Sequence, residues 1–69
     1  MERLHVVSSM AVTVGYDAAD KILEIEFRTG EVWQYHNVPK DVHLELISGS
    51  IGKYFQSSIK GQYPESRIR

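Results

Sequence analysis

The stretch Leu23-Glu24-Ile25-Glu26-Phe27-Arg28-Thr29-Gly30-Glu31-Val32-Trp33-Gln34-Tyr35 predicts a β-hairpin and the way its two strands pair. Apolar and polar residues alternate along 22–28 and again along 32–37, which is typical of strands with one buried face. A two-residue loop would require positive φ at the β-branched Thr29, whereas a three-residue loop at 28–30 places only Gly30 in the left-handed region. We therefore expect the three-residue loop, with a glycine bulge at Gly30.

This register decides where the two aromatic residues of the second strand point. Ile25 faces Trp33 in this pairing, and Leu23 faces Tyr35 one pair further along, because residues directly opposite each other share a face of the sheet. The opposite face collects four polar residues: Glu24, Glu26, Gln34 and His36. We therefore expect Trp33 and Tyr35 on the core face, with the indole largely protected from an aqueous quencher.

The segments before and after the hairpin complete the predicted elements. Met10–Tyr16 alternates as the hairpin strands do and predicts one more antiparallel strand. Pro39 suits the start of a first helix that Gly49 ends, and Ser50 can cap a second helix that stops at Gly61. Apolar residues recur at helical spacing in both: Val42, Leu46 and, as an open choice, Ile47 in the first, and Ile51, Tyr54, Phe55 and Ile59 in the second.

The predicted fold class is α+β, with the order βββαα. A three-stranded antiparallel meander is covered on one face by two short helices. All 69 residues form a single domain, with a core at about 9–63 and a polar tail at 64–69. The chain contains no Cys and no apolar run long enough to span a membrane, so we expect a cytoplasmic protein without a membrane partner.

No set of residues in the sequence predicts an enzyme or a metal site. His5, His36 and His43 have no acidic residue at a recognisable ligand spacing. The segment 49–54 has some likeness to a phosphate loop, but it is one position short and lacks the magnesium-binding hydroxyl. Helix capping by Ser50 explains this segment without a ligand. We expect no catalytic residue, no cofactor and no metal.

Charge is spread unevenly along a chain whose net charge is −1. Residues 1–49 hold four bases and eight acids, whereas residues 50–69 hold one acid and four bases: Lys53, Lys60, Arg67 and Arg69. Lys53 and Lys60 are about two helical turns apart and can share one side of the second helix. Two interpretations stay open: a basic strip that follows a phosphate backbone, or the solvated face of an amphipathic helix.

Several short motifs follow one another in an order that resembles a known family: Val14-Gly15-Tyr16-Asp17, Leu23-Glu24-Ile25-Glu26-Phe27, Gly30, Trp33-Gln34-Tyr35, Val38-Pro39, Ser50-Ile51-Gly52-Lys53-Tyr54-Phe55 and Ile59-Lys60. The succession is similar to that of the KTSC domain, a short bacterial domain found alone and at the C-terminus of some lysyl-tRNA synthetases. The resemblance runs from about Ser9 to Tyr63. The family's central Tyr-x-Tyr stands here as Trp33-Gln34-Tyr35, which keeps an aromatic ring but not the first hydroxyl. RNA binding is what the synthetase context implies.

These observations together predict a non-catalytic binding module. The leading hypothesis is weak electrostatic binding of nucleic acid, RNA in particular, through four residues: Lys53, Lys60, Arg67 and Arg69. Trp33 and Tyr35 are assigned to the core and are not expected to stack on bases. The alternative is a protein partner, bound at an unpaired sheet edge or at the acidic face that carries Glu24 and Glu26.

Overall fold

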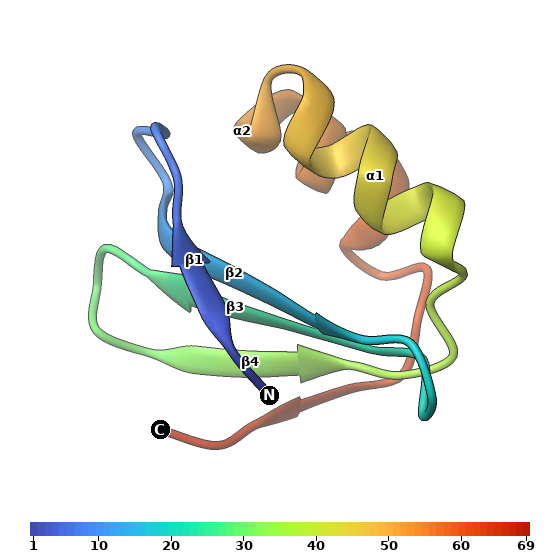
Figure 1. Ribbon diagram of the computed structural model, residues 1–69. Helices are drawn as coiled ribbons and strands as arrows, with labels where there is room; N and C mark the ends of the chain where they lie inside the picture. Colours follow the sequence, from blue (N-terminus) through green and yellow to red (C-terminus); the bar gives the residue numbers. More distant parts are fainter.

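The computed structural model describes the whole chain, residues 1–69, as an antiparallel sheet with helices on one face (Figure 1). The elements in chain order are β1 (Arg3–His5), β2 (Ala11–Asp17), β3 (Ile22–Phe27), β4 (Val32–Tyr35), α1 (Lys40–Ser48), α2 (Ile51–Tyr54), the π-helical segment η1 (Phe55–Ile59) and β5 (Glu65–Arg67). The five strands lie side by side in the order β1-β2-β3-β4-β5. The α+β class and the two-layer arrangement are confirmed, but the expected count of three strands was wrong. None of the helices is long and apolar enough to cross a membrane.

The pairing of β3 with β4 has the register that the loop predicts. Gly30 adopts φ +96°, in the left-handed region that favours glycine. Its amide donates to the carbonyl of Phe27 over 2.9 Å, and the amide of Phe27 donates to the carbonyl of Glu31 over 2.8 Å. The register pairs Ile25 with Trp33 and Leu23 with Tyr35, as expected. Both aromatic residues therefore lie on the sheet face that the helices cover.

The sequence analysis did not predict β1 and β5, the two outermost strands of the sheet. β1 pairs with β2, and β5 pairs with β4. The segment 64–69, expected to be a polar tail, is exposed but contains β5, which pairs with the free edge of β4. The amide of His36 donates to the carbonyl of Pro64, and that of Val32 donates to the carbonyl of Arg69, each over 2.8 Å. Backbone amides that would otherwise need water thus find partners within the chain.

A bulge interrupts the alternation that was expected along β2. Ala11 pairs with Phe27, but Thr13 pairs with Glu26, so the register shifts by one residue at Val12. The bulge turns Ala11 toward the core, where it is fully buried, although strict alternation places it on the opposite face. The side chain of Thr13 points the other way, and its hydroxyl donates to the Glu26 carboxylate over 3.1 Å.

The helical half follows the expected boundaries, with one change of geometry. Pro39 precedes α1, Gly49 follows it, and the Ser50 hydroxyl accepts the amide of Lys53 at the start of α2. From Phe55 onward the helix widens into η1. Four of the apolar residues expected to face the core are buried: Leu46, Ile51, Phe55 and Ile59. Ile47, which was an open choice, does not belong to the buried stripe, because it is 44% exposed.

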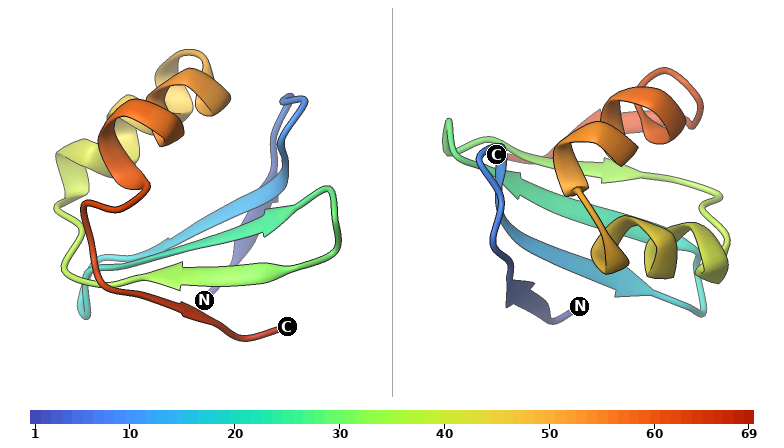
Figure 2. Two further views of the ribbon diagram at one scale, coloured as in Figure 1. Left: turned by 180° about the vertical axis from the view of Figure 1, so that it is seen from behind. Right: turned by 90° about the horizontal axis from the view of Figure 1, so that it is seen from above.

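The hydrophobic core lies between the sheet and the helices (Figure 2). It is built from buried side chains of both layers: Ala11, Val14, Leu23, Ile25 and Tyr35 from the strands, Val38 from the connection, and Leu46, Ile51, Phe55 and Ile59 from the helices. Tyr16 links the layers, because its hydroxyl donates to the carbonyl of Val38 over 2.5 Å and its ring stacks on His43 of α1 at 4.7 Å. The core thus fixes the helices relative to the face that carries Trp33 and Tyr35.

On the opposite face of the sheet, Gly15 leaves room for an ion pair that crosses a strand. Gly15 of β2 lies between Arg3 of β1 and Glu24 of β3 in the register. The Arg3 side chain passes over the glycine, and its Nε lies 3.3 Å from Glu24 Oε2. A Cβ at position 15 would lie 2.8 Å from Arg3 Cγ and 2.8 Å from the carbonyl oxygen of Glu2. No side chain fits there without movement of the β1 backbone.

We expect Gly15→Ala to lower the free energy of unfolding by about 1–3 kcal/mol, the usual cost of overpacking. Urea denaturation followed by circular dichroism measures this change. Gly52→Ala is the matched control, because no atom lies within 4 Å of the Cβ that it adds in α2. That variant should be neutral or more stable by up to about 1 kcal/mol. Equal effects of the two substitutions would contradict the close approach of β1 to Gly15.

Candidate functional site

A groove opens on the helix-facing side of the sheet, toward the end that carries the β1–β2 and β3–β4 loops. The helices lie over the other end of the sheet, so the two layers diverge toward these loops (Figures 1 and 2). The groove has a volume of about 420 Å³ and an apolar floor formed by Met10, Phe27, Trp33, Tyr35 and Phe55. Four charged residues also line it: Arg28, Glu31, Lys60 and Glu65. This volume lies within the range of sites that bind small molecules or a few residues of a polymer.

Trp33 forms part of this floor while remaining half-buried against the core. Its indole Nε1 donates to Glu31 Oε1 over 2.9 Å, which fixes the orientation of the ring. Arg67 is the cross-strand partner of Trp33 in β5, and its Nε lies 3.9 Å from the same carboxylate oxygen. Glu31 is therefore engaged by both an indole and a guanidinium, and the ring is held with one part in the core and another in the groove.

Tyr35 is buried more deeply, with 3% of its surface exposed. Its ring meets Phe55 edge to face at 5.6 Å, and Phe55 in turn meets Phe27 at 5.5 Å. Tyr35 lines the groove, and its hydroxyl, which is not fully buried, makes no hydrogen bond within the chain. Burial, and to a smaller extent the charge of Glu65, raises the pKa of Tyr35 to about 12. At neutral pH the hydroxyl is thus a neutral donor without an internal partner.

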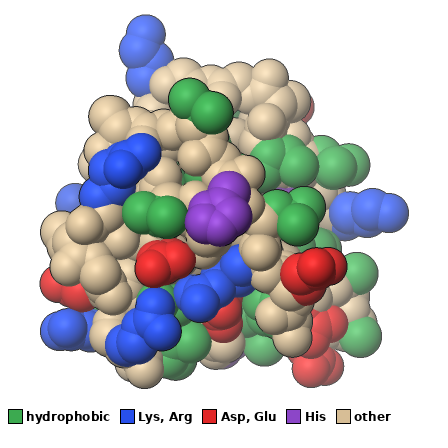
Figure 3. Space-filling model, turned by 60° about the vertical axis from the view of Figure 1, so that its left-hand side comes forward, with side chains coloured by type: hydrophobic (Ala, Val, Ile, Leu, Met, Phe, Trp, Pro, Cys, Tyr) green, Lys and Arg blue, Asp and Glu red, His purple; other side chains and the backbone are tan.

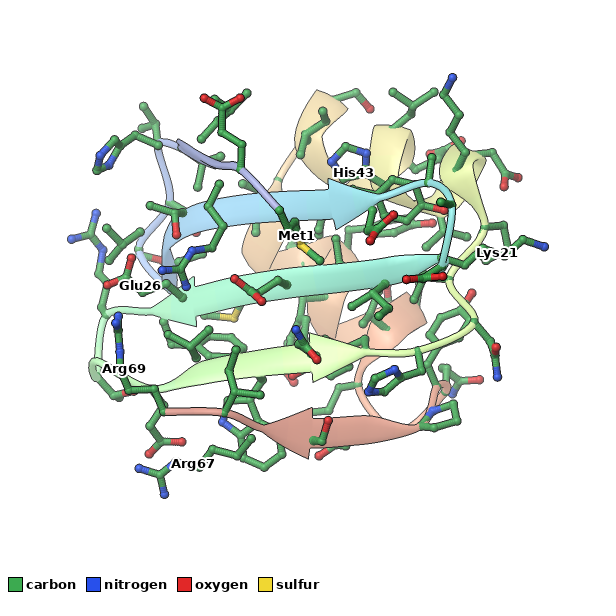
Figure 4. The ribbon with its side chains drawn as sticks, turned by 60° about the horizontal axis from the view of Figure 1, so that its bottom comes forward. Met1, Lys21, Glu26, His43, Arg67 and Arg69 are labelled. Atoms are coloured by element: carbon green, nitrogen blue, oxygen red, sulfur yellow. The ribbon has the colours of Figure 1, made fainter.

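The four basic residues of the leading hypothesis do not form one strip. Lys53 lies on α2, and of the four only Lys60 lines the groove. Arg67 projects from the edge strand, and Arg69 lies near Glu26 at the end of the sheet (Figure 4). Arg69 Nη2 is 3.4 Å from Glu26 Oε2, so both arginines already contact acids. On the face toward the loops, basic, acidic and apolar side chains are intermixed rather than grouped by sign (Figure 3).

The acidic face of the sheet, opposite the helices, is occupied by internal contacts. Glu24 pairs with Arg3 and also accepts a hydrogen bond from the side-chain amide of Gln34 over 2.9 Å. Glu26 accepts from Thr13 and pairs with Arg69. Both carboxylates therefore have partners within the chain. No group of three His, Asp or Glu side chains lies close enough together to hold a metal ion.

The groove brings together residues that the sequence analysis did not connect. Met10 belongs to the β1–β2 loop, Arg28 to the β3–β4 loop and Phe55 to η1. The register correctly predicts that Trp33 and Tyr35 lie on the helix-facing side of the sheet. It does not predict that both residues also line an open groove on that side. The helices leave part of this face uncovered, and no local pattern in the sequence signals how far a packed helix extends.

Comparisons with known proteins place the chain in one family. A family model described as the KTSC domain matches residues 7–63. An uncharacterised protein of Stutzerimonas stutzeri is 36% identical over 64 residues, which cover 91% of this chain and 90% of that protein. A lysine–tRNA ligase of a Nostoc species is 35% identical over 54 residues, which cover 77% of this chain and 10% of the ligase. The crystal structure of a KTSC domain protein from Yersinia pestis matches with a TM-score of 0.95 at 36% identity, covering 99% of this chain and 97% of that one.

The raised pKa of Tyr35 predicts a loss of stability at alkaline pH. The unfolded chain ionises this tyrosine near its ordinary pKa of 10.0, whereas the folded chain keeps the proton up to a pKa of about 12. Between these values the folded state binds more protons, so the free energy of unfolding falls as pH rises from about 10 to about 12. Urea denaturation at several pH values measures this decline. Tyr35→Phe should make the decline shallower, while the raised pKa values of Tyr16 and Tyr54 keep part of it, and a parallel decline in both proteins would contradict the assignment.

Proposed function

The chain belongs to the KTSC domain family, and we propose that it is a non-catalytic module that binds an extended segment of a partner protein in the aromatic groove. The groove of about 420 Å³ is the observation that carries this proposal. Its floor combines a half-buried Trp, a Tyr, two Phe and a Met, residue types that are enriched where proteins bind one another. Rings held by a core bind with little loss of side-chain entropy.

The distribution of charge favours a peptide over a nucleic acid. A phosphate backbone carries one negative charge per nucleotide and is bound by several cations that follow it. Here Arg67 and Arg69 contact Glu31 and Glu26, while Lys53 lies away from the groove. The groove itself contains two acids beside its two bases. Charges of both signs around an apolar floor suit a polypeptide segment better than a polyanion.

The groove also replaces the surfaces considered earlier for a protein partner. The carboxylates of Glu24 and Glu26 have partners within the chain, so they offer little to a basic ligand. β1 and β5 do leave exposed edges, but each is only three residues long. Short edge strands are a common way in which proteins avoid pairing with other chains. The groove has the larger volume and a mainly aromatic floor, whereas the hollow beside β1 has a volume of about 330 Å³.

The relatives support a modular role without specifying a ligand. The match covers most of the Stutzerimonas stutzeri relative but only a small part of the lysine–tRNA ligase. This pattern is typical of a domain that occurs both alone and as part of larger proteins. We include the cytoplasmic location in the proposal, because the ligase relative and the absence of Cys both agree with it.

We expect Trp33→Leu to weaken peptide binding by about tenfold or more, because it removes the flat ring but keeps an apolar side chain against the core. The probe is a pool of fluorescein-labelled pentapeptides of mixed sequence, and fluorescence anisotropy measures binding. Circular dichroism checks that the variant is folded. Leu44→Ala is the matched control, because Leu44 is a half-exposed apolar residue of α1 that does not line the groove.

The same assay includes a labelled single-stranded RNA of mixed sequence at low salt. We expect the peptide pool to bind and the RNA to bind weakly or not at all. RNA binding that falls steeply with salt and is lost in a Lys53→Glu, Lys60→Glu double variant would overturn the proposal in favour of electrostatic nucleic-acid binding. Failure of the peptide pool to bind would also overturn it.

A further inference from the structure

Two cations line the groove without an acidic partner. Neither Arg28 nor Lys60 forms an ion pair within the chain, whereas Arg3, Arg67 and Arg69 each lie beside a glutamate. Arg28 Nε donates to the backbone carbonyl of Ser8 over 2.8 Å. This bond ties the guanidinium to the β1–β2 loop and leaves its two terminal nitrogens free. An arginine held in this way loses less entropy when it binds an oxyanion.

The acids of the groove are not equally available. Glu31 is already engaged by the Trp33 indole at 2.9 Å and by Arg67 at 3.9 Å. Glu65 is the remaining acid without an ion pair. Two free cations against one free anion leave the groove with a small excess of positive charge. That excess matches a single negative group on the ligand rather than a chain of phosphates.

Tyr35 adds a third polar group to the lining of the groove. Tyr35 as a residue is 3% exposed, and its hydroxyl has no hydrogen-bond partner within the chain. The hydroxyl oxygen is not among the buried atoms that lack a partner, so it remains accessible from the groove and free to donate to a ligand. The hydroxyl is therefore suited to donate to an oxygen atom of a bound segment.

We infer that the groove binds the free C-terminal end of its partner segment. Arg28 and Lys60 bind the terminal carboxylate, the Tyr35 hydroxyl donates to a backbone carbonyl oxygen, and the last side chain packs as an apolar group on Phe27 and Trp33. A chain terminus is the part of a polypeptide that joins one fixed negative charge to an apolar side chain, which is the combination that the groove offers. This inference rests on the proposed function and specifies its ligand.

The test compares two peptide pools of identical mixed sequence, one with free C-terminal carboxylates and one with amidated C-termini. We expect the free-acid pool to bind the full chain about tenfold more tightly than the amidated pool. Lys60→Gln and Arg28→Gln should each remove most of this difference, and Lys53→Gln, an exposed lysine outside the groove, should leave it unchanged. Tyr35→Phe should weaken binding of both pools several-fold, because it removes the hydroxyl that donates to a backbone carbonyl of the peptide. The variant should still fold, because the hydroxyl makes no hydrogen bond within the chain.

The outcomes separate this inference from the proposed function. Equal binding of the two pools would overturn the assignment of a terminal carboxylate while leaving a groove for internal peptide segments. Binding of neither pool would overturn both. A free-acid preference that survives both Lys60→Gln and Arg28→Gln would place the carboxylate elsewhere and contradict the assignment to these two residues.

Discussion

The backbone of Gly30 is the constraint on which the rest of the structure depends. Its φ of +96° closes a three-residue loop between β3 and β4, and that loop sets the register of the hairpin. A shift of one residue would exchange the two faces of β4, because side chains alternate along a strand. Trp33 and Tyr35 would then lie on the face without helices, and Gln34 would face the core.

The same register accounts for both faces of the sheet. On one face the aromatic residues of β4 pack with Phe27 and Phe55 and form the groove floor. On the other face Glu24 lies beside Gln34, and Gly15 lets Arg3 reach the same carboxylate. On the polar face Glu24 and Glu26 have partners within the chain, and Arg3 Nη1 is the one buried nitrogen without a hydrogen bond, whereas on the aromatic face two cations form no ion pair and a hydroxyl has no internal partner. This contrast is why we assign ligand binding to the aromatic face.

The hairpin and the helix boundaries could be predicted from the sequence because local patterns decide them. Gly30 permits one loop geometry, Ser50 caps a helix, and apolar spacing identifies Leu46 as buried. β1 and β5 could not be predicted in this way, because each is three residues long and mostly exposed, so neither carries an alternating pattern. The bulge at Val12 also left no signal, since it depends on how β2 pairs with β3.

The candidate site was only half predictable for a related reason. The positions of Trp33 and Tyr35 followed from the register, but the groove also needs residues from two loops and from η1. Charge counted along the chain was misleading, because Arg67 and Arg69 contact Glu31 and Glu26, which are distant in sequence. A net charge over a segment therefore says little about a binding surface until the partners of each charge are known.

The most direct measurement is a map of backbone and indole NMR chemical shifts on addition of the free-acid peptide pool. The account predicts that the largest changes cluster at the Trp33 indole and around the groove, at Phe27, Arg28 and Lys60. The amides of Lys53 and of β1 should change little. Changes centred on α2, on an outer strand edge or on the polar face of the sheet would contradict the central claim that the aromatic groove is the binding site.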